Sequence, residues 1–110
     1  MLRNQIGVMQ GRLLPKYQGR YQAHPVGYWE QEFDLAQGIG LDCIEFILDF
    51  NDAKNNPLLE KGGVDNILSV TDKTGVSVKT VCADYFMEAP LHSQDSLCVE
   101  NSIDVLVKLL

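Results

Sequence analysis

Residues 43–48 read Cys-Ile-Glu-Phe-Ile-Leu, a run that is apolar on both sides except at Glu45. Runs of this kind are typical of parallel β-strands, because helices cover at least one face of a parallel sheet. Two other short apolar runs, Ile6–Met9 and the β-branched Val76–Ala83, stand before and after it. The sequence therefore predicts three strands in this order.

A segment with apolar residues at helical spacing follows each predicted strand. The first has Trp29, Phe33 and Ala36 three and four apart, with Leu35 and Ile39 alongside, and ends at Gly38 and Gly40. The second and third segments carry apolar or β-branched residues at Val64, Ile67, Leu68 and Thr71, and at Val99, Ile103, Leu106, Val107 and Leu110. Strands that alternate with helices indicate a parallel sheet with right-handed crossovers. The predicted fold class is α/β: three βα units of a parallel (β/α) TIM-like barrel, incomplete unless another chain completes it.

The chain is short for a closed barrel of this kind. It has 110 residues, whereas an eight-stranded barrel has about 250 residues and roughly 200 at least. We expect residues 1–110 to form one N-terminal partial barrel domain, either a fragment, a truncated gene product or a half-barrel that another subunit completes. Three parallel strands leave two open edges and one uncovered face. Self-association or completion by another chain is therefore expected.

Charge and composition narrow the class of partner. Asp and Glu outnumber Lys and Arg by 15 to 9, which gives a formal net charge of −6. This field repels phosphodiester backbones, so no nucleic-acid partner is expected. No apolar stretch is long enough for a membrane span or a signal peptide, and no membrane partner is expected. Three cysteines without a C-x-x-C pair fit reduced thiols, and hence a cytoplasmic location.

The connections that leave the predicted strands are long, and those that leave the helices are short. In parallel α/β folds the strand-to-helix connections build ligand sites at the carboxyl ends of the strands. We predict substrate-binding residues there, and these are Gln10, Arg12, Glu45, Asp84 and Tyr85. No catalytic residue and no metal ligand is assigned.

Four of these residues have a structural alternative. Alternation in residues 43–48 directs Ile44, Phe46 and Leu48 toward the helices, and Glu45 toward the barrel lumen. Glu45 then serves either a substrate pocket or a hydrogen bond to a neighbouring strand. The planar fork of Arg12 suits a carboxylate or phosphate, or it anchors a loop. Asp84 and Tyr85, at the end of the third strand, line a pocket or cap the next loop.

The remaining chemically active side chains favour structural roles. Cys82 is interpreted as a small buried hydrophobe, and His24 and His92 as solvated loop residues. Trp29 and Phe33 belong to the helical core. Tyr17, Tyr21 and Tyr28 either line the mouth of the pocket or pack within their loop.

Residues 6–15, Ile-Gly-Val-Met-Gln-Gly-Arg-Leu-Leu-Pro, resemble the opening strand of the sugar phosphate isomerase/epimerase family. These xylose-isomerase-like barrels also include apurinic endonucleases. Three further stretches agree in order: Trp29-Glu30-Gln31-Glu32-Phe33 with Ala36, Gly40-Leu41-Asp42-Cys43-Ile44-Glu45, and Val81-Cys82-Ala83-Asp84-Tyr85-Phe86. The resemblance spans essentially the whole chain but only the first three-eighths of the family's barrel.

The resemblance implies metal-assisted isomerisation or epimerisation of a small sugar or sugar phosphate by the full-length parent. Members of the family hold a divalent metal (Mn, Mg or Zn) on Glu, Asp and His at strand ends, mainly on later strands. No metal is therefore expected on this chain alone, and Cys82 stands where the endonuclease branch has a His. Two alternatives remain: a non-catalytic assembly module that oligomerises through its open strand edges, and an apurinic endonuclease relative.

Overall fold

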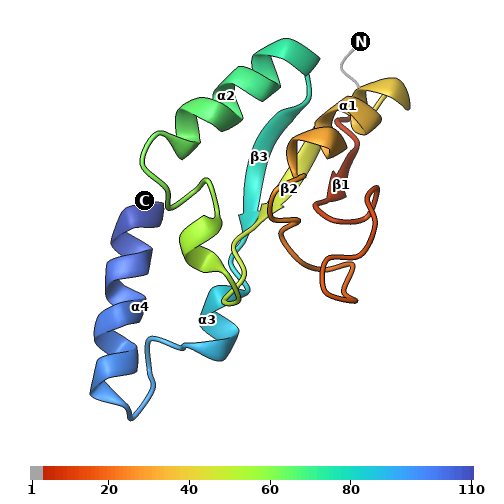
Figure 1. The fold of residues 1–110 in the computed structure, drawn as a ribbon. Coiled ribbons are helices and arrows are strands. Elements are labelled where there is room, and N and C mark those ends of the chain that lie inside the picture. Colours follow the sequence, from red (N-terminus) through yellow and green to blue (C-terminus); the bar gives the residue numbers. More distant parts are fainter. Residues whose placement is uncertain (1–3) are drawn as a thin grey trace.

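The computed structural model describes residues 4–110, with a three-stranded parallel sheet in the order β1-β2-β3 (Figure 1). Along the chain the elements are β1 (Gly7–Met9), α1 (Glu30–Gly38), β2 (Cys43–Ile47), the 3-10 turn η1 (Ala53–Asn55), α2 (Gly63–Thr74), β3 (Ser77–Cys82), α3 (Tyr85–Glu88) and α4 (Ser96–Leu109). The predicted α/β class, with three parallel strands and alternating helices, is confirmed.

The central strand β2 determines which side chains face the helices. It pairs with β1 through Gly7 and Cys43 and through Met9 and Glu45, and with β3 through Ile47 and Cys82. The pairing with β3 is irregular between Ile44 and Phe46. Side chains alternate along a strand, and Ile44 and Phe46 are both fully buried beneath the helices. The predicted orientation of these two residues is confirmed.

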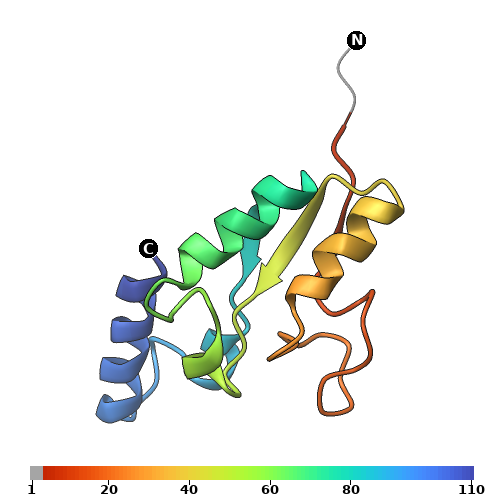
Figure 2. The ribbon, with the colours of Figure 1, turned by 45° about the horizontal axis from the view of Figure 1, so that its top comes forward.

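Helices α1 and α2 cover one face of the sheet, as Figures 1 and 2 show. The core between them and the sheet consists of Trp29, Phe33, Ala36, Ile44, Phe46, Ile67 and Val76. The ring of Trp29 meets the rings of Phe33 and Phe46 edge-on, with centroids 5.9 and 5.8 Å apart, a favourable geometry for aromatic pairs. Trp29 and Phe33 are core residues, as predicted. Leu35 and Ile39, at the outer side of α1, are exposed.

Helix α4 stands to one side of the sheet (Figure 1). Asp95 caps it by accepting a hydrogen bond from the backbone N–H of Leu97 at 3.0 Å. Its inner side packs on a second core cluster, formed by Leu48, Tyr85 and Ala89. The opposite side carries Ile103, Val107 and Leu110, which are 48%, 67% and 95% exposed.

The end of the third strand differs from the prediction. The sequence placed Asp84 and Tyr85 at its end, whereas β3 stops at Cys82 and Tyr85 begins the four-residue helix α3. A helix of four residues is too short to show a helical period in the sequence.

No helix within residues 4–110 has the length and apolar character needed to cross a membrane.

Candidate ligand site at the carboxyl edge of the sheet

The connections that follow the three strands meet at the edge where the strands end, the lower edge in Figure 1, here called the carboxyl edge. They comprise residues 10–29, 48–62 and 83–84, whereas the connections from helix to strand are only 39–42 and 75–76. The predicted contrast between long and short connections is confirmed for the first two units. The third strand is followed almost at once by α3.

Gln10 lies within the core rather than at the open edge. It is fully buried, and its Oε1 accepts a hydrogen bond from the backbone N–H of Ile47 at 2.9 Å. On the other side of β2's end, Asn56 Nδ2 donates to the carbonyl oxygen of Ile47 at 2.8 Å. Two side-chain amides thus satisfy both backbone polar groups of the last residue of β2. Gln10, predicted to bind substrate, is placed here as an anchor of the loop after β1.

The prediction that His24 is a solvated loop residue is wrong. Its ring is only 3% exposed and packs against Phe46 with centroids 5.3 Å apart. Nδ1 lies 3.1 Å from Gln10 Oε1, and since that oxygen is an acceptor, Nδ1 carries the proton. Burial lowers the pKa of His24 to about 4, so the ring is neutral at pH 7. His92 is exposed, as predicted.

Glu32, a residue that the sequence analysis did not single out, fixes the start of the first loop. Its fully buried carboxylate accepts hydrogen bonds from the backbone N–H of Gly11 at 2.8 and 2.9 Å and from that of Leu13 at 3.0 Å. Burial raises the pKa of Glu32, and these backbone bonds oppose the increase. The position of a glutamate on a helix does not reveal that its partners lie in a loop about 20 positions earlier. The glycine at position 11 is the sequence feature that marks this place in the loop.

Arg12, Gln22 and Asp84 form a line of polar contacts across the carboxyl edge. Arg12 Nη2 donates to Gln22 Oε1 at 3.4 Å, and Gln22 Nε2 donates to Asp84 Oδ2 at 2.8 Å. The Cys82 thiol donates to the other oxygen of Asp84 at 3.3 Å. The structure thus brings together two predicted site residues, Arg12 and Asp84, through Gln22, which the sequence analysis did not identify.

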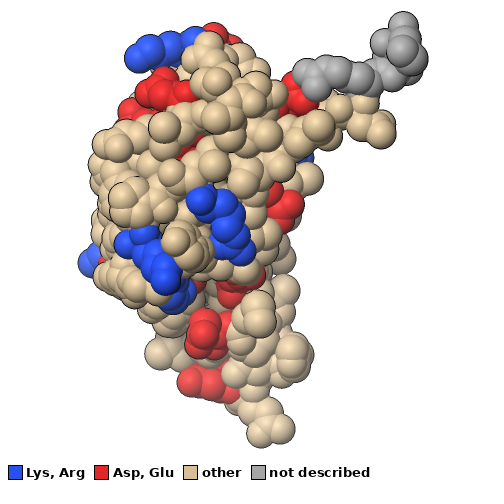
Figure 3. Space-filling view, turned by 90° about the vertical axis from the view of Figure 1, so that its right-hand side faces the viewer, with Lys and Arg blue, Asp and Glu red and all other residues tan. Residues whose placement is uncertain are grey.

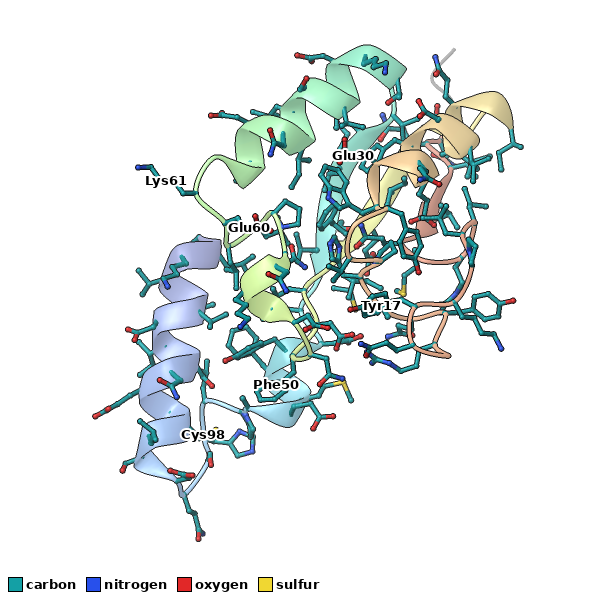
Figure 4. All side chains as sticks on the ribbon, viewed as in Figure 1. Tyr17, Glu30, Phe50, Glu60, Lys61 and Cys98 are labelled. Carbon is teal, nitrogen blue, oxygen red and sulfur yellow. The ribbon has the colours of Figure 1, made fainter. Side chains whose placement is uncertain are left out.

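Two further contacts attach the first loop to the second. Arg20 forms an ion pair with Asp49 at 2.9 Å, and the hydroxyl of Tyr17 donates to Asp52 at 2.7 Å. The bond to Asp52 raises the pKa of Tyr17. Tyr17, labelled in Figure 4, belongs to the first loop, and its ring is 6.4 Å from that of Tyr28. Tyr28 packs within its loop, the second of the two predicted roles, Tyr17 also contacts the second loop, and Tyr21 is 50% exposed.

Glu45 lies on the face of the sheet that no described helix covers. Its Oε2 accepts a hydrogen bond from Thr80 Oγ1 on β3 at 2.9 Å. Together with Met9, Cys43 and Gly7 these side chains line a shallow hollow of about 300 Å³. Of the two predicted roles, a hydrogen bond to the neighbouring strand is present. The hollow keeps Glu45 accessible to a ligand on this face.

Tyr85 lies apart from the other predicted site residues. It is buried in the second core cluster, between the rings of Phe50 and Phe86, both 5.2 Å away. Its ring lines a cavity of about 650 Å³ between α4 and the second loop. Phe50 and Cys98, labelled in Figure 4, border the same cavity. Tyr85 therefore belongs to a hollow beside α4, not to the line of contacts from Arg12 to Asp84.

The residues that the structure describes do not form a metal centre. Within residues 4–110, no three His, Cys, Asp or Glu side chains are arranged so that they could hold an ion. His24 is buried on the helix side of the sheet, and Glu45 lies on the other side, bonded to Thr80. Burial and the neighbouring Asp84 raise the pKa of Cys82 to about 11, which keeps it a neutral thiol. The side chains at this edge suit hydrogen bonding to a polar ligand.

No family model matches the chain, and no curated protein matches it significantly.

Proposed function

We propose that this chain is the N-terminal portion of a sugar phosphate isomerase/epimerase-like barrel, and that its carboxyl edge binds a small sugar or sugar phosphate. The observation that carries the proposal is the line of contacts from Arg12 through Gln22 to Asp84. These side chains come from the loops after β1 and β3, on either side of the central strand. Carboxylates, amides and guanidinium groups at this edge of a parallel sheet are suited to the hydroxyl groups of a sugar.

The charge of the first loop supports an anionic group on the ligand. Residues 11–29 include Arg12, Lys16 and Arg20 and no Asp or Glu, although the chain as a whole carries −6. Figure 3 looks onto the side where this loop lies and shows Lys and Arg side chains near the middle of that face. Arg12 is exposed and makes one long hydrogen bond to oxygen, so its remaining N–H donors are open to a phosphate.

The proposed role of this chain is binding of the sugar at its carboxyl edge; within residues 4–110 no group of three or more His, Cys, Asp or Glu side chains could hold a metal ion. In the parent barrel the metal-assisted step would use Glu, Asp and His side chains from outside the described residues. Three free cysteines support a reducing, cytoplasmic setting for the protein.

The test is an NMR titration of the chain with inorganic phosphate and a panel of pentose and hexose phosphates. We expect amide and side-chain signals of Arg12, Arg20 and Gln22 to shift, and Arg12→Gln to weaken binding about tenfold, the loss of one charge-assisted hydrogen bond. Lys79→Gln, on the exposed part of β3, removes the same charge away from the site and is the matched control. Shifts confined to other surfaces, or equal effects of the two variants, would contradict the proposal.

The outer side of α4 favours a second candidate, assembly with a second copy of the chain. Ile103, Val107 and Leu110 are largely exposed at helical spacing, with half-buried Val99 and Leu106 beside them. An unpaired apolar stripe of this kind is typical of a helix–helix interface. An antiparallel pair with the two stripes aligned also opposes the dipoles of the two helices.

Light scattering after size-exclusion chromatography tests this candidate. We expect a dimer that Val107→Glu dissociates, whereas Asp104→Asn, on the side of α4 that faces the cavity, leaves it intact. A monomeric wild-type chain at high micromolar concentration would refute self-assembly and leave the sugar-binding proposal untouched.

A further inference from the structure

The Glu32 carboxylate accepts hydrogen bonds from the two residues on either side of Arg12. Gly11 donates its N–H to both carboxylate oxygens, and Leu13 donates to Oε2. A buried carboxylate without partners is costly, so these charge-assisted bonds also determine where the loop can lie. Successive backbone N–H groups around an anion form a concave nest. Here the chain's own side chain fills that nest.

The backbone at Gly11 is adapted to this arrangement. Its φ of +93° lies in the region that glycine adopts most readily. A Cβ at this position would lie against the carbonyl oxygen of Tyr21 and 2.9 Å from that of Ala23. The loop therefore folds back closely over residue 11, and the same return of the chain brings Gln22 to within 3.4 Å of Arg12.

We propose that Glu32 is the positioning residue of the carboxyl edge: its carboxylate fixes the backbone of residues 11–13 so that the Arg12 guanidinium faces Gln22 and the bound anion. The part of this inference that concerns the anion rests on the proposed function. Glu32 itself is fully buried and does not touch the ligand. Its effect on binding is transmitted through Arg12 alone.

A double-mutant cycle with inorganic phosphate as the probe tests this coupling. The chain, Glu32→Gln, Arg12→Gln and the double variant are titrated by NMR. We expect Glu32→Gln to weaken phosphate binding about tenfold, and the double variant to bind no more weakly than Arg12→Gln alone, because coupled residues are not additive. Glu30→Gln is the matched control, since Glu30 is exposed at the start of the same helix (Figure 4). Additive losses, or an equal loss in the control, overturn the inference.

A second readout does not depend on any ligand. Glu32→Gln is expected to move the amide signals of Gly11 and Leu13 and the side-chain signal of Arg12, while Glu30→Gln moves none of them. If the wild-type chain ignores phosphate but these signals move, the proposed function fails and the positioning role stands. If Arg12 is unmoved, the positioning role fails.

The wild-type chain provides the same test if Glu32→Gln does not fold. On acidification the amide signals of Gly11 and Leu13 report protonation of Glu32. Arg12, whose charge acts on Glu32, is expected to change its side-chain signal at the same midpoint. An Arg12 signal that does not follow this midpoint refutes the inference.

Discussion

Acidification from pH 7 to pH 4.5 is expected to destabilise the protein through His24. The ring is 3% exposed, and its Nδ1–H donates to Gln10 in the core. Within the described structure Nε2 of His24 is buried without a hydrogen-bond partner. A proton added at Nε2 would therefore place an unpaired charge against Phe46, whereas the same charge is fully hydrated in the unfolded chain.

The size of this effect follows from the difference in pKa. The folded-state pKa is about 4, against 6.5 for an unperturbed histidine. The unfolded chain therefore binds the proton first, and stability falls as the pH drops from 6.5 toward 4. At 1.36 kcal/mol for each pH unit, the full loss is about 3 kcal/mol. This contribution is fully present above pH 6.5.

Urea unfolding of the chain and of His24→Asn across this pH range measures the effect. The asparagine amide keeps a donor near Nδ1 but does not titrate. The contributions of carboxylates that titrate in the same pH range cancel when the unfolding free energies of the two proteins are subtracted. We expect the difference in unfolding free energy to change by about 1 kcal/mol for each pH unit between pH 6 and pH 4.5. His92→Asn, at an exposed position, is the control. Parallel pH profiles for the chain and His24→Asn would refute the reasoning.

Three further predictions concern the fold around the site. Gly11→Ala should lower the free energy of unfolding by about 1–3 kcal/mol, because φ is +93° and carbonyl oxygens lie where the Cβ would stand. Gly27→Ala, at φ +86° with open space around it, should lower it less. Equal losses for the two variants in urea unfolding would contradict this. Phe46→Ala should cost about 3–5 kcal/mol, since the ring is fully buried, whereas Phe50→Ala should cost clearly less at 44% exposure; thermal unfolding compares the two. At pH 8 the Cys82 thiol, with its pKa near 11, should be alkylated about a hundredfold more slowly than a free cysteine. Asp84→Asn should accelerate this alkylation, and mass spectrometry follows both rates. Rapid labelling of Cys82 in the folded protein would show that the thiol is ionised.

The sequence was sufficient to predict the sheet because its strands and helices carry period information. Residues 43–48 predicted a buried strand, and the structure forms β2 from Cys43 to Ile47. The spacing of Trp29, Phe33 and Ala36 predicted a core-facing helix, and all three are buried in one cluster. Hydrophobic burial is the dominant favourable term in folding, so a periodic apolar pattern is a reliable guide to such elements.

The candidate site was predicted less well because its contacts are polar and distant in sequence. His24 stands beside a proline in a long loop, a context typical of solvated residues, yet the loop carries it beneath the helices. Glu32 and Gln22 find partners 10 to 62 positions away, a distance that no periodicity reveals. Arg12 and Asp84 were predicted because they follow strands, and the position of a residue at a strand end is readable from the chain.

The hydrogen bonds of Gln10 and Asn56 with the backbone of Ile47 have a consequence for how the loops can vary. Both side-chain amides hold the backbone of Ile47, Gln10 from the start of the connection after β1 and Asn56 from within the connection after β2. A change of length elsewhere in either connection is expected to leave the end of β2 in place as long as both amides are kept. The end of the central strand and the outer parts of the two loops can then vary separately, divided at two amide groups.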